Sequence, residues 1–474
     1  MKRQLGDWLD RRTGIRGLLR AALDEPIPGG ASFAYVFGSA LLFLFLSQVI
    51  TGVFLALYYV PSADHAHTTV AYVVKVVSSG SFVHSLHVYG SSAIIIVLLL
   101  HIGQTILFGS YKGYRELLWL SGCVLMALML AMAFTGYLLP WDQKAYFATA
   151  VSTNIFALPL IGSWFKQFVR GGNELGTLTI SRFFVAHVFL LPAAVFAFVG
   201  MHVYLFRRVG AAGAPTARTG RASTSFYPRQ MLMDIAFTTV LILALGTLAW
   251  WLPAELGPEA NAADTRFLPR PEWYYVPMFQ WLKYWEGQRA VIGIFVIPML
   301  IGALFAGLPF VDRGTERRPW RRPFTVGLFA ALMLALVTLG MTSYAQDRRD
   351  PAVARQLDFQ RDAMRVFMSQ PFEPEESARS LRGANAALVA LSDPLVAHGR
   401  TIFEAQSCDA CHGADGHGTE SAPSLVGAAA RHPSGELSRV IRTPTAKMAD
   451  SGMQPLDIPD DDLAALSAYV AGLK

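Results

Sequence analysis

Two apolar segments of the sequence each hold a pair of histidines. His87 and His101 stand fourteen residues apart in one segment, and His187 and His202 stand fifteen apart in the other. In an α-helix these separations span about 21 and 22 Å and place both imidazoles on roughly one face. Two such helices could hold two haems, each clamped between two imidazoles. A lone intramembrane histidine often makes only an interhelical hydrogen bond, but four at matched spacing favour metal ligands.

Two further apolar segments carry glycines with the same period. Gly38 and Gly52 are fourteen residues apart, as are Gly122 and Gly136. A residue without a side chain lets a bulky ring approach the backbone. Small residues also serve helix packing in membranes, but the shared period favours haem pockets.

Composition predicts an all-α, polytopic membrane bundle. The chain has 474 residues, 53% of them hydrophobic and 16% charged. About 20 apolar residues are needed to cross the hydrocarbon core. Seven spans are expected near residues 33–60, 83–108, 116–139, 182–206, 231–252, 290–310 and 324–345.

The charged segments predict the orientation of these spans. Basic residues gather in the N-terminus and in the segments 109–115, 207–229 and 312–322. These segments lie on one side if seven spans alternate, so that side is cytoplasmic and the C-terminus lies opposite. The net charge of +6 is therefore explained without nucleic acid. Residues 1–30 are expected to form an amphipathic surface helix.

The C-terminal part, residues 392–474, reads as a small soluble domain that follows a polar linker at 347–391. Cys408, Cys411 and His412 form CDACH, the signature of covalent c-type haem attachment. A disulfide or a zinc site with histidine ligands is the alternative. Met453, before an amphipathic helix, is the candidate sixth iron ligand, and Met448 is its rival.

A third chemical feature is the stretch PRPEWYYVPMFQWLKYW at 269–285. Glu272 stands there between prolines and aromatic residues, where partial desolvation would suit a carboxylate that accepts a proton. Taken alone, the stretch is more simply explained as an interfacial aromatic belt with an incidental glutamate.

Together, FGSALLFLFLSQVITG, GYLLPWDQ, SRFFVAH and PEWYY resemble cytochrome b of the quinol-oxidising cytochrome bc complexes, over about residues 25–345. The C-terminal domain resembles a class I cytochrome c. The first resemblance implies a four-helix dihaem core at 31–210 and a three-helix part at 211–346. It implies a low-potential haem b between His87 and His187, a high-potential haem b between His101 and His202, and one haem c in the last domain.

The resemblance also implies two quinone sites. Glu272 would accept the quinol proton, and the site would be completed by Tyr137, Pro140, Pro271, Trp273 and Tyr274. Asp142 is expected to help the proton leave, with a solvated loop carboxylate as the equal alternative. At the other quinone site Asp234 matches an acidic family position, and Arg229 is a substitute candidate for proton uptake.

Two departures from the family pattern stand out. His84 occupies the place of an arginine that usually pairs with a haem propionate. Val36 stands where the photosynthetic bf-type branch of the cytochrome b family has a cysteine that holds an extra haem. No such haem is therefore expected.

The expected function is therefore that of a cytochrome b subunit with a fused cytochrome c in a bacterial quinol:cytochrome c oxidoreductase of the inner membrane. One quinol electron would pass to a Rieske iron-sulfur partner and the other through the two b haems. A homodimer is expected, with lipid around it and a further cytochrome c or oxidase as acceptor. A dihaem anchor of another quinone-linked dehydrogenase or reductase and a proton-relaying transporter are the alternatives.

Overall fold

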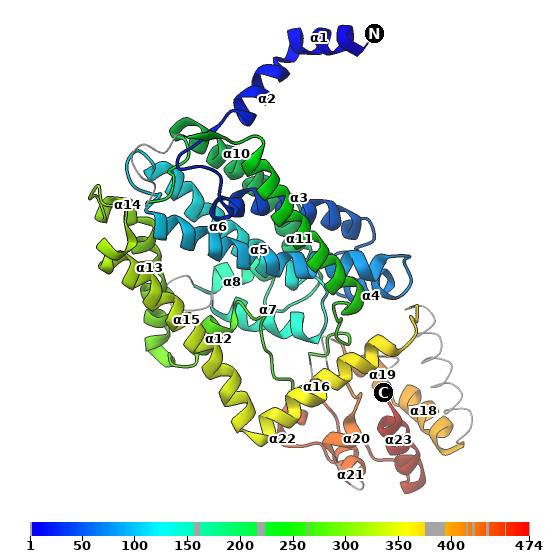
Figure 1. Ribbon diagram of the computed structural model, residues 1–474. Helices are drawn as coiled ribbons and strands as arrows, with labels where there is room; N and C mark the ends of the chain where they lie inside the picture. The colour runs from blue at the N-terminus through cyan, green and yellow to red at the C-terminus, as the bar shows by residue number, and fades with distance from the viewer. Residues whose placement is uncertain are drawn as a thin grey trace. The chain divides into compact units, whose positions relative to one another are not determined.

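The computed structural model divides into two units, Met1–Phe372 and Glu373–Lys474. Both are built almost entirely of helices (Figure 1). The structure describes residues 2–155, 162–215, 223–374 except 263 and 265, 394–413, 416–419, 422–432, 436–450 and 452–473. Within these ranges the extended structure is limited to β1 (Pro26–Ile27) and β2 (Thr224–Ser225), which pair antiparallel.

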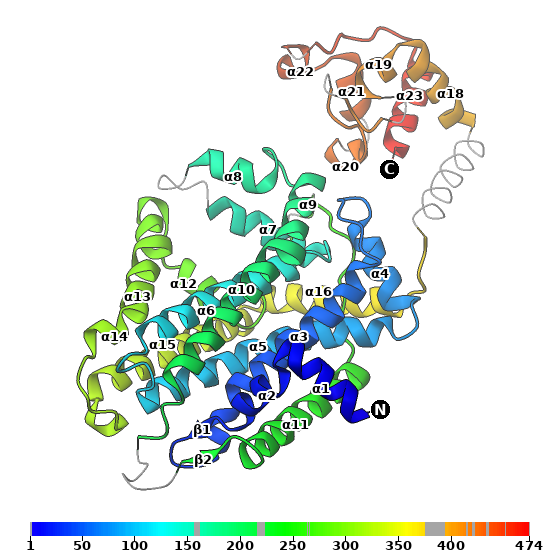
Figure 2. The same cartoon turned by 90° about the horizontal axis from the view of Figure 1, so that it is seen from above.

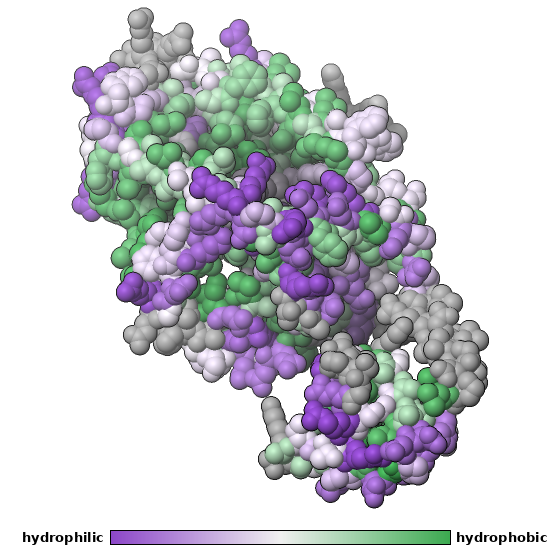
Figure 3. Space-filling model, turned by 90° about the horizontal axis from the view of Figure 1, so that it is seen from below, coloured by the Kyte–Doolittle hydropathy of each residue, from purple (hydrophilic) through white to green (hydrophobic). Residues whose placement is uncertain are grey.

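In the described part of the first unit, six helical segments are long and apolar enough to cross a membrane. Their bounds are Phe33–Ala56 (containing α3, Val36–Ala56), Gly80–Phe108 (α5), Glu116–Tyr137 (α6), Thr177–Val209 (α9, Thr177–Val185, and α10, Leu191–Val209, joined by a π turn), Arg229–Trp251 (α11) and Pro323–Arg349 (α15). Large apolar side chains such as Ile50, Leu243 and Val337 are exposed on them, and Figure 3 shows hydrophobic residues gathered on the surface. The chain is a membrane protein.

The segment predicted as a span near 290–310 is a shorter and interrupted helix. It consists of the π turn Ile292–Val296, α13 (Ile297–Ala306) and α14 (Leu308–Val311). Pro298 follows the π turn, and Pro192 follows the other π turn, Ala186–Leu190. A proline cannot donate its backbone hydrogen bond and its ring crowds the preceding turn, which the wider π turn relieves.

The helices that carry the predicted glycines pack against those that carry the histidines. α3 contacts α5, and α6 contacts α10. α11 covers α3 and α5 (Figure 2). A buried apolar cluster fills the interface between α3 and α5, formed by Ala40, Leu44, Ala93, Ile94 and Val97. The dihaem core that the sequence predicts is therefore a set of two contacting helix pairs.

The connecting segments gather at two ends of the helices. At one end, Tyr59 donates a hydrogen bond to the carbonyl of Leu139 at 2.7 Å, and His67 Nε2 lies 2.8 Å from the carbonyl oxygen of Gly257. These contacts join the segments after α3, α6 and α11. Short helices lie in two of them: α4 (Ala66–Lys75), and α7 (Gln143–Ile155) with α8 (Ser163–Arg170).

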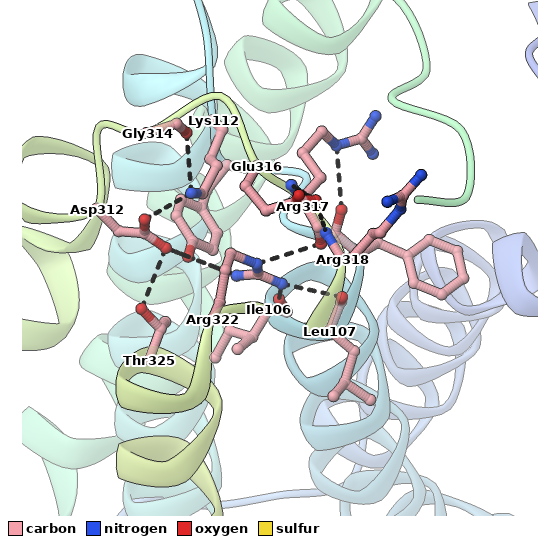
Figure 4. Close-up of polar contacts among 12 residues, drawn as sticks. Ile106, Leu107, Lys112, Asp312, Gly314, Glu316, Arg317, Arg318, Arg322 and Thr325 are labelled. Atoms are coloured by element: carbon pink, nitrogen blue, oxygen red, sulfur yellow. Dashed lines mark hydrogen bonds and ion pairs between the residues drawn. The ribbon is translucent and has the colours of Figure 1, made fainter. Parts of the chain in front are cut away.

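At the opposite end, Asp312 is the centre of a polar cluster (Figure 4). It accepts hydrogen bonds from Lys112 at 2.5 Å, from Tyr111 at 2.5 Å and from Thr325 at 3.1 Å. Burial raises the pKa of Asp312, but the bonds from Lys112 and Tyr111 outweigh it and hold that pKa below its ordinary value. Arg322 donates to the carbonyl of Ile106 at 2.7 Å, so the segment before α15 is fixed to the end of α5.

Two further segments differ from the sequence prediction. The N-terminus forms two helices, α1 (Lys2–Thr13) and α2 (Ile15–Leu23), instead of one, because Gly14 between them adopts a left-handed conformation with φ of 62°. The expected linker at 347–391 begins as ordered helix: α15 runs to Arg349 and α16 spans Pro351–Ser369. Asp350 caps α16 by accepting from the backbone N–H of Ala352 at 2.9 Å. Residues 375–391 lie outside the described residues.

α16 is held against the membrane unit by polar contacts. Gln360 accepts from the backbone N–H of Leu268 at 2.8 Å and donates to its carbonyl at 3.1 Å. Lys75 donates to the carbonyls of Phe367 and Gln370 at the end of α16. The first half of the predicted linker is therefore part of the first unit.

The second unit is a small helical domain. α18 (Pro394–Ala405) packs against α23 (Asp460–Gly472), and α21 (Glu436–Arg442) also contacts α23. Its core includes Phe403 and Leu466, which are almost fully buried. α19 (Cys408–His412) carries the whole CDACH motif.

Candidate functional site

One histidine pair lies near the end of the bundle where Tyr59 meets Leu139. His87 comes from α5, and His187 comes from the π turn before α10. Their ring centroids are 6.3 Å apart and their planes are inclined by 80°. A metal–imidazole bond is about 2.1 Å long, so two imidazoles on opposite sides of one metal have centroids roughly 6 Å apart. The observed separation suits a shared iron.

The second pair lies nearer the opposite end. His101 and His202 interact electrostatically, and they come from the second halves of α5 and α10. Each pair thus combines one histidine from α5 with one from the segment 177–209. This is the pairing that the sequence predicts.

Each of the four predicted glycines faces one of the four histidines. A Cβ atom added to the glycine would meet the imidazole Cε1 atom at 2.5 Å for Gly136 and His187, 3.1 Å for Gly52 and His87, 3.3 Å for Gly122 and His202, and 3.7 Å for Gly38 and His101. At the first three positions a methyl group would press on the ring. The glycines therefore leave room for the imidazoles themselves.

Hydroxyl groups orient three of the imidazoles, a feature that the sequence reasoning missed. Nδ1 lies 2.9 Å from Thr51 in His87, 3.1 Å from Thr135 in His187 and 2.8 Å from Ser121 in His202. Each hydroxyl already donates its hydrogen to a backbone carbonyl one helical turn earlier. The oxygen must therefore accept from Nδ1–H, which leaves Nε2 without a hydrogen and able to bind a metal.

The sequence held a signal for this arrangement. Each hydroxyl residue directly precedes one of the predicted glycines, as the dipeptides TG, SG and TG at 51–52, 121–122 and 135–136. Phe37 precedes Gly38, so His101 has no equivalent partner from that position.

If a haem b lies between His101 and His202, replacing Ser121 by alanine is expected to weaken its binding by about 10-fold and to raise its midpoint potential. Without an acceptor at Nδ1, His202 becomes a poorer donor to iron, which favours the reduced state. A redox titration of the b absorption bands measures the effect. The control is Thr105→Ala, because in the described part of the chain the Thr105 hydroxyl donates to the backbone carbonyl of His101 and bonds no imidazole nitrogen. Equal midpoints in both variants would contradict the assignment.

His84 supplies an independent test of whether the pocket fits a haem. Its side chain is 8% exposed, and its Nδ1 atom has no hydrogen-bond partner among the residues that the structure describes. A buried polar atom without a partner costs about 1 to 3 kcal/mol. His84 lies one turn before His87 on α5, so a carboxylate of a bound haem would provide the missing acceptor. The residues present fit the group.

The predicted quinol residues gather at the same end as His87. Tyr275 lies between Tyr137 and Tyr274, with ring centroids 6.3 and 4.8 Å away. Glu272 interacts electrostatically with Tyr137 and Tyr274. Burial, and then the charge of Glu272, raise the pKa of Tyr274, so this phenol stays protonated. Glu272 itself forms an ion pair with Lys144 of α7 at 2.5 Å.

Other predicted members of this site have distinct places. Trp273 donates to the hydroxyl of Ser92 on α5 at 3.3 Å. Pro271 lines a cavity of about 820 Å³. Pro140 is partly buried just beyond the end of α6.

Asp142 has a structural task. It is 9% exposed, so it is not a solvated loop carboxylate. One oxygen accepts from the N–H of Ala145 at 2.8 Å, and the other accepts from the N–H of Gly257 at 3.0 Å. Asp142 therefore caps the start of α7 and fixes the segment after α11 to it.

Asp234 and Arg229, the two residues predicted for the other quinone site, differ in burial. Asp234 is buried and accepts from Ser39 at 2.6 Å and from Gln230 at 2.8 Å, which joins α11 to α3. Arg229 is exposed at the first residue of α11.

In the second unit, His412 donates from Nδ1 to the carbonyl of Pro423 at 2.8 Å, which leaves Nε2 for a metal. Burial, and then the charge of Asp409, raise the pKa of the Cys408 thiol. No group of three or more His, Cys, Asp or Glu side chains suited to a metal is found in the described parts of the chain. The rivals Met453 and Met448 are neighbours, with a backbone hydrogen bond of 3.0 Å between them.

Three family models match the chain. They are Cytochrome b/b6/petB over residues 22–210, Cytochrome b(C-terminal)/b6/petD over 259–357, and Cytochrome c over 396–474. Cytochrome b of Mycosarcoma maydis is 33% identical over 69% of this chain and 84% of that protein. The chain belongs to the cytochrome b family. The resemblance inferred from the sequence, including the fused cytochrome c domain, is confirmed.

Other relatives are similar to this cytochrome b over different shares of its length. Cytochrome b/c1 of Bradyrhizobium diazoefficiens is 30% identical over 70% of this chain and 49% of that protein. The menaquinol:cytochrome c reductase cytochrome b subunit of Bacillus subtilis is 38% identical over 45% of this chain and 99% of that protein. A solved structure named hyperthermophilic respiratory Complex III aligns with a TM-score of 0.64 and 26% identity, over 77% of this chain and 97% of that one. Cytochrome b and cytochrome c domains imply haem b and haem c.

Proposed function

We propose that this chain is the cytochrome b subunit, with its own cytochrome c domain, of a bacterial quinol:cytochrome c oxidoreductase coupled to proton translocation. The observation that carries the proposal is the packing of four glycines against four paired histidines, with the Glu272 cluster at one end of the same bundle. Relatives named as menaquinol:cytochrome c reductase subunits support the activity.

The proposed haem ligands follow from the pairing described above. His87 with His187, and His101 with His202, would each hold one haem b. Cys408, Cys411 and His412 would hold haem c, with Met453 as the sixth ligand. When bound, the b haems would carry one quinol electron across the membrane, while a Rieske partner would deliver the other to haem c.

The choice of Met453 over Met448 has its own test. Met453→Ala is expected to abolish the methionine-to-iron absorption band of the oxidised cytochrome c domain and to lower its midpoint potential. Met448→Ala is the matched control. The reverse pattern would assign Met448 instead.

At the proposed quinol-oxidation site, the chain's own groups hold the substrate and take its proton. Tyr137, Tyr274 and Tyr275 form an aromatic wall that excludes water. The Glu272 carboxylate accepts the proton of the quinol hydroxyl as general base. At the opposite end, near Asp234, quinone would be reduced, and the exposed Arg229 is the candidate for proton uptake there.

The chain is proposed to cross the membrane seven times. Gly257, in the segment after α11, contacts His67 at the end of the bundle where Tyr59 meets Leu139. Asp312, which follows α14, contacts Lys112 at the opposite end. The intervening segment with α13 would then run from one end of the bundle to the other. Basic residues mark the Asp312 end as cytoplasmic, and the cytochrome c domain would then lie on the positive side of the bacterial inner membrane.

The proposed partners are a Rieske iron-sulfur protein, a second copy of this chain, and a further cytochrome c or oxidase as electron acceptor. The test is an assay of the purified complex for cytochrome c reduction by quinol, with and without inhibitors that block quinol sites. Inhibitor-sensitive turnover that needs a Rieske subunit is expected. Turnover without one would favour a dihaem anchor of another quinone-linked dehydrogenase or reductase.

A further inference from the structure

Segment 268–272, which ends at Glu272, is stiff but has few backbone contacts of its own. Pro269 and Pro271 fix two backbone φ angles, and the residue before each proline is confined to extended conformations. Neither proline has a backbone N–H to donate. Among the described residues, the backbone-to-backbone hydrogen bonds of this region end at Phe267 and begin again at Glu272. Side chains must therefore hold the segment in place.

In the described part of the chain, two side chains from other helices provide this support. Gln360 of α16 accepts from the N–H of Leu268 at 2.8 Å and donates to its carbonyl at 3.1 Å, so both polar groups of that backbone position are satisfied. Asp347, near the end of α15, accepts two hydrogen bonds from Arg270, at 2.8 and 2.7 Å. The segment is thus anchored both four and two residues before Glu272.

α16 is itself fixed at both ends, so Gln360 is held on a docked helix. It follows α15 directly, and Asp350 caps its start. At its other end Lys75, the last residue of α4, donates to the carbonyls of Phe367 and Gln370 at 2.5 and 3.0 Å. The partial negative charge of a helix C-terminus favours a cation at this place. Figure 1 shows α16 running from α15 toward α4.

The chain on the other side of Glu272 is held as well. The carbonyl of Glu272 accepts from the N–H groups of Tyr275 at 2.8 Å and Val276 at 3.2 Å, which starts α12 (Val276–Leu282). The Tyr275 hydroxyl donates to the carbonyl of Leu130 on α6 at 2.6 Å. The position of Glu272 is therefore set by α6 on one side and by α15 and α16 on the other.

Most of α16 lies outside the matched cytochrome domains, because the C-terminal cytochrome b match ends at residue 357 and the cytochrome c match begins at 396. We propose that Gln360 of α16 is a positioning residue for the quinol-oxidation site. By holding Leu268 it keeps the stiff segment 268–272, and with it the Glu272 side chain, in the conformation that binds quinol. The inference rests on the proposed quinol oxidation at Glu272. It adds a supporting residue that lies beyond the matched cytochrome b domains.

The effect of Gln360 is expected on quinol affinity. Without Gln360, segment 268–272 samples several positions in the free enzyme and has to be ordered when quinol binds, which lowers the affinity. Once quinol is bound, the same groups face it, so the rate of the bound complex changes little. A loss of binding of this kind raises KM and leaves kcat nearly unchanged.

The test is steady-state quinol oxidation by the assembled complex that carries Gln360→Ala. Loss of two neutral hydrogen bonds predicts a rise in the KM for quinol of about 10-fold, with kcat within about twofold of the parent value. The affinity for an inhibitor that blocks quinol oxidation, measured by calorimetry, should fall by a similar factor. Gln356→Ala, one turn earlier on α16, is the matched control, because no hydrogen bond from its side chain to segment 268–272 is found among the described residues.

Asp347→Asn tests the second anchor of the same segment. It removes the charge that holds Arg270, while Gln360 still holds Leu268. In the double variant with Gln360→Ala, the rise in KM should exceed the product of the two separate rises, because each anchor limits the motion that loss of the other permits. A rise equal to that product would contradict a shared action through segment 268–272.

Three results with the single variants would overturn the inference. Unchanged KM and inhibitor affinity in Gln360→Ala would show that Leu268 needs no anchor. A fall in kcat with loss of haem b at unchanged KM would indicate that Gln360 only supports the fold, and an equal rise in KM in Gln356→Ala would assign the effect to α16 as a whole.

Failure of the proposed function is seen separately, in the parent complex. If the parent oxidises quinol and is blocked by the inhibitor, while Gln360→Ala matches it in KM and inhibitor affinity, only the role of Gln360 is wrong. If the parent complex does not oxidise quinol, the proposed function is wrong, and the inference that rests on it is wrong as well.

Discussion

Replacing Gly136 by alanine is expected to remove the outer haem b, proposed between His87 and His187, and to leave the inner one, proposed between His101 and His202, in place. The added Cβ would lie 2.5 Å from Cε1 of His187 and 3.1 Å from both ring nitrogens. A real methyl group cannot sit at that distance, so the imidazole must tilt out of line with His87. Because Thr135 also fixes this ring, the tilt breaks a second contact. The measurement is the b-haem content of the purified variant, which should fall from two per chain toward one.

The other glycines provide a graded series and a control. The expected loss decreases from Gly136 to Gly52, then Gly122, then Gly38, as the clearance of the added Cβ grows from 2.5 to 3.7 Å. Gly246→Ala on α11 is the control, because a Cβ there has no neighbour within 4 Å. Full haem content in Gly136→Ala would contradict the placement of the outer haem at His187.

Replacing Glu272 by glutamine is expected to slow quinol oxidation by about 100-fold or more, because a positioned general base contributes about that factor. Glutamine keeps the size of the side chain but cannot take the quinol proton. Both b haems should keep their spectra, since in the described part of the chain Glu272 is paired with Lys144 and acts electrostatically on Tyr137 and Tyr274, and no interaction with a proposed haem ligand is seen there. The measurement is quinol-driven reduction of haem b in a single turnover.

Glu255→Gln provides the matched control for this variant. Glu255 lies in the same connection after α11 and is exposed, so its loss of charge should leave the rate unchanged. Loss of a b haem in Glu272→Gln would mean that the carboxylate supports the fold. Equal rates in the two variants would remove Glu272 from the reaction.

Much of the core could be predicted because its signals are periodic. Paired imidazoles at two depths of a bundle require small residues opposite them at the same two depths, and the period of fourteen in Gly38, Gly52, Gly122 and Gly136 reflects that requirement. Long apolar runs likewise gave six helices close to their observed bounds. Such patterns can be recognised in the sequence because each depends on the spacing of residues within a single helix.

Contacts between distant segments could not be predicted in this way. The pairing of Thr51, Ser121 and Thr135 with their histidines depends on how helices rotate against each other. α16 is polar and charged on most of its surface, so its composition resembled a linker, and its docking became evident only through partners such as Gln360 and Lys75. The short α13 lost its uniform helical geometry to Pro298, which composition alone did not reveal.

The most direct test of the account is the haem content of the purified chain. A pyridine haemochrome spectrum gives the ratio of haem b to haem c, and a denaturing gel stained for haem shows which is covalently bound. Two b haems for each covalent haem c are predicted, from the two histidine pairs and the CDACH motif. A folded chain with covalent haem c and no haem b would contradict the four-histidine assignment, and quinol oxidation through this cytochrome b would fall with it.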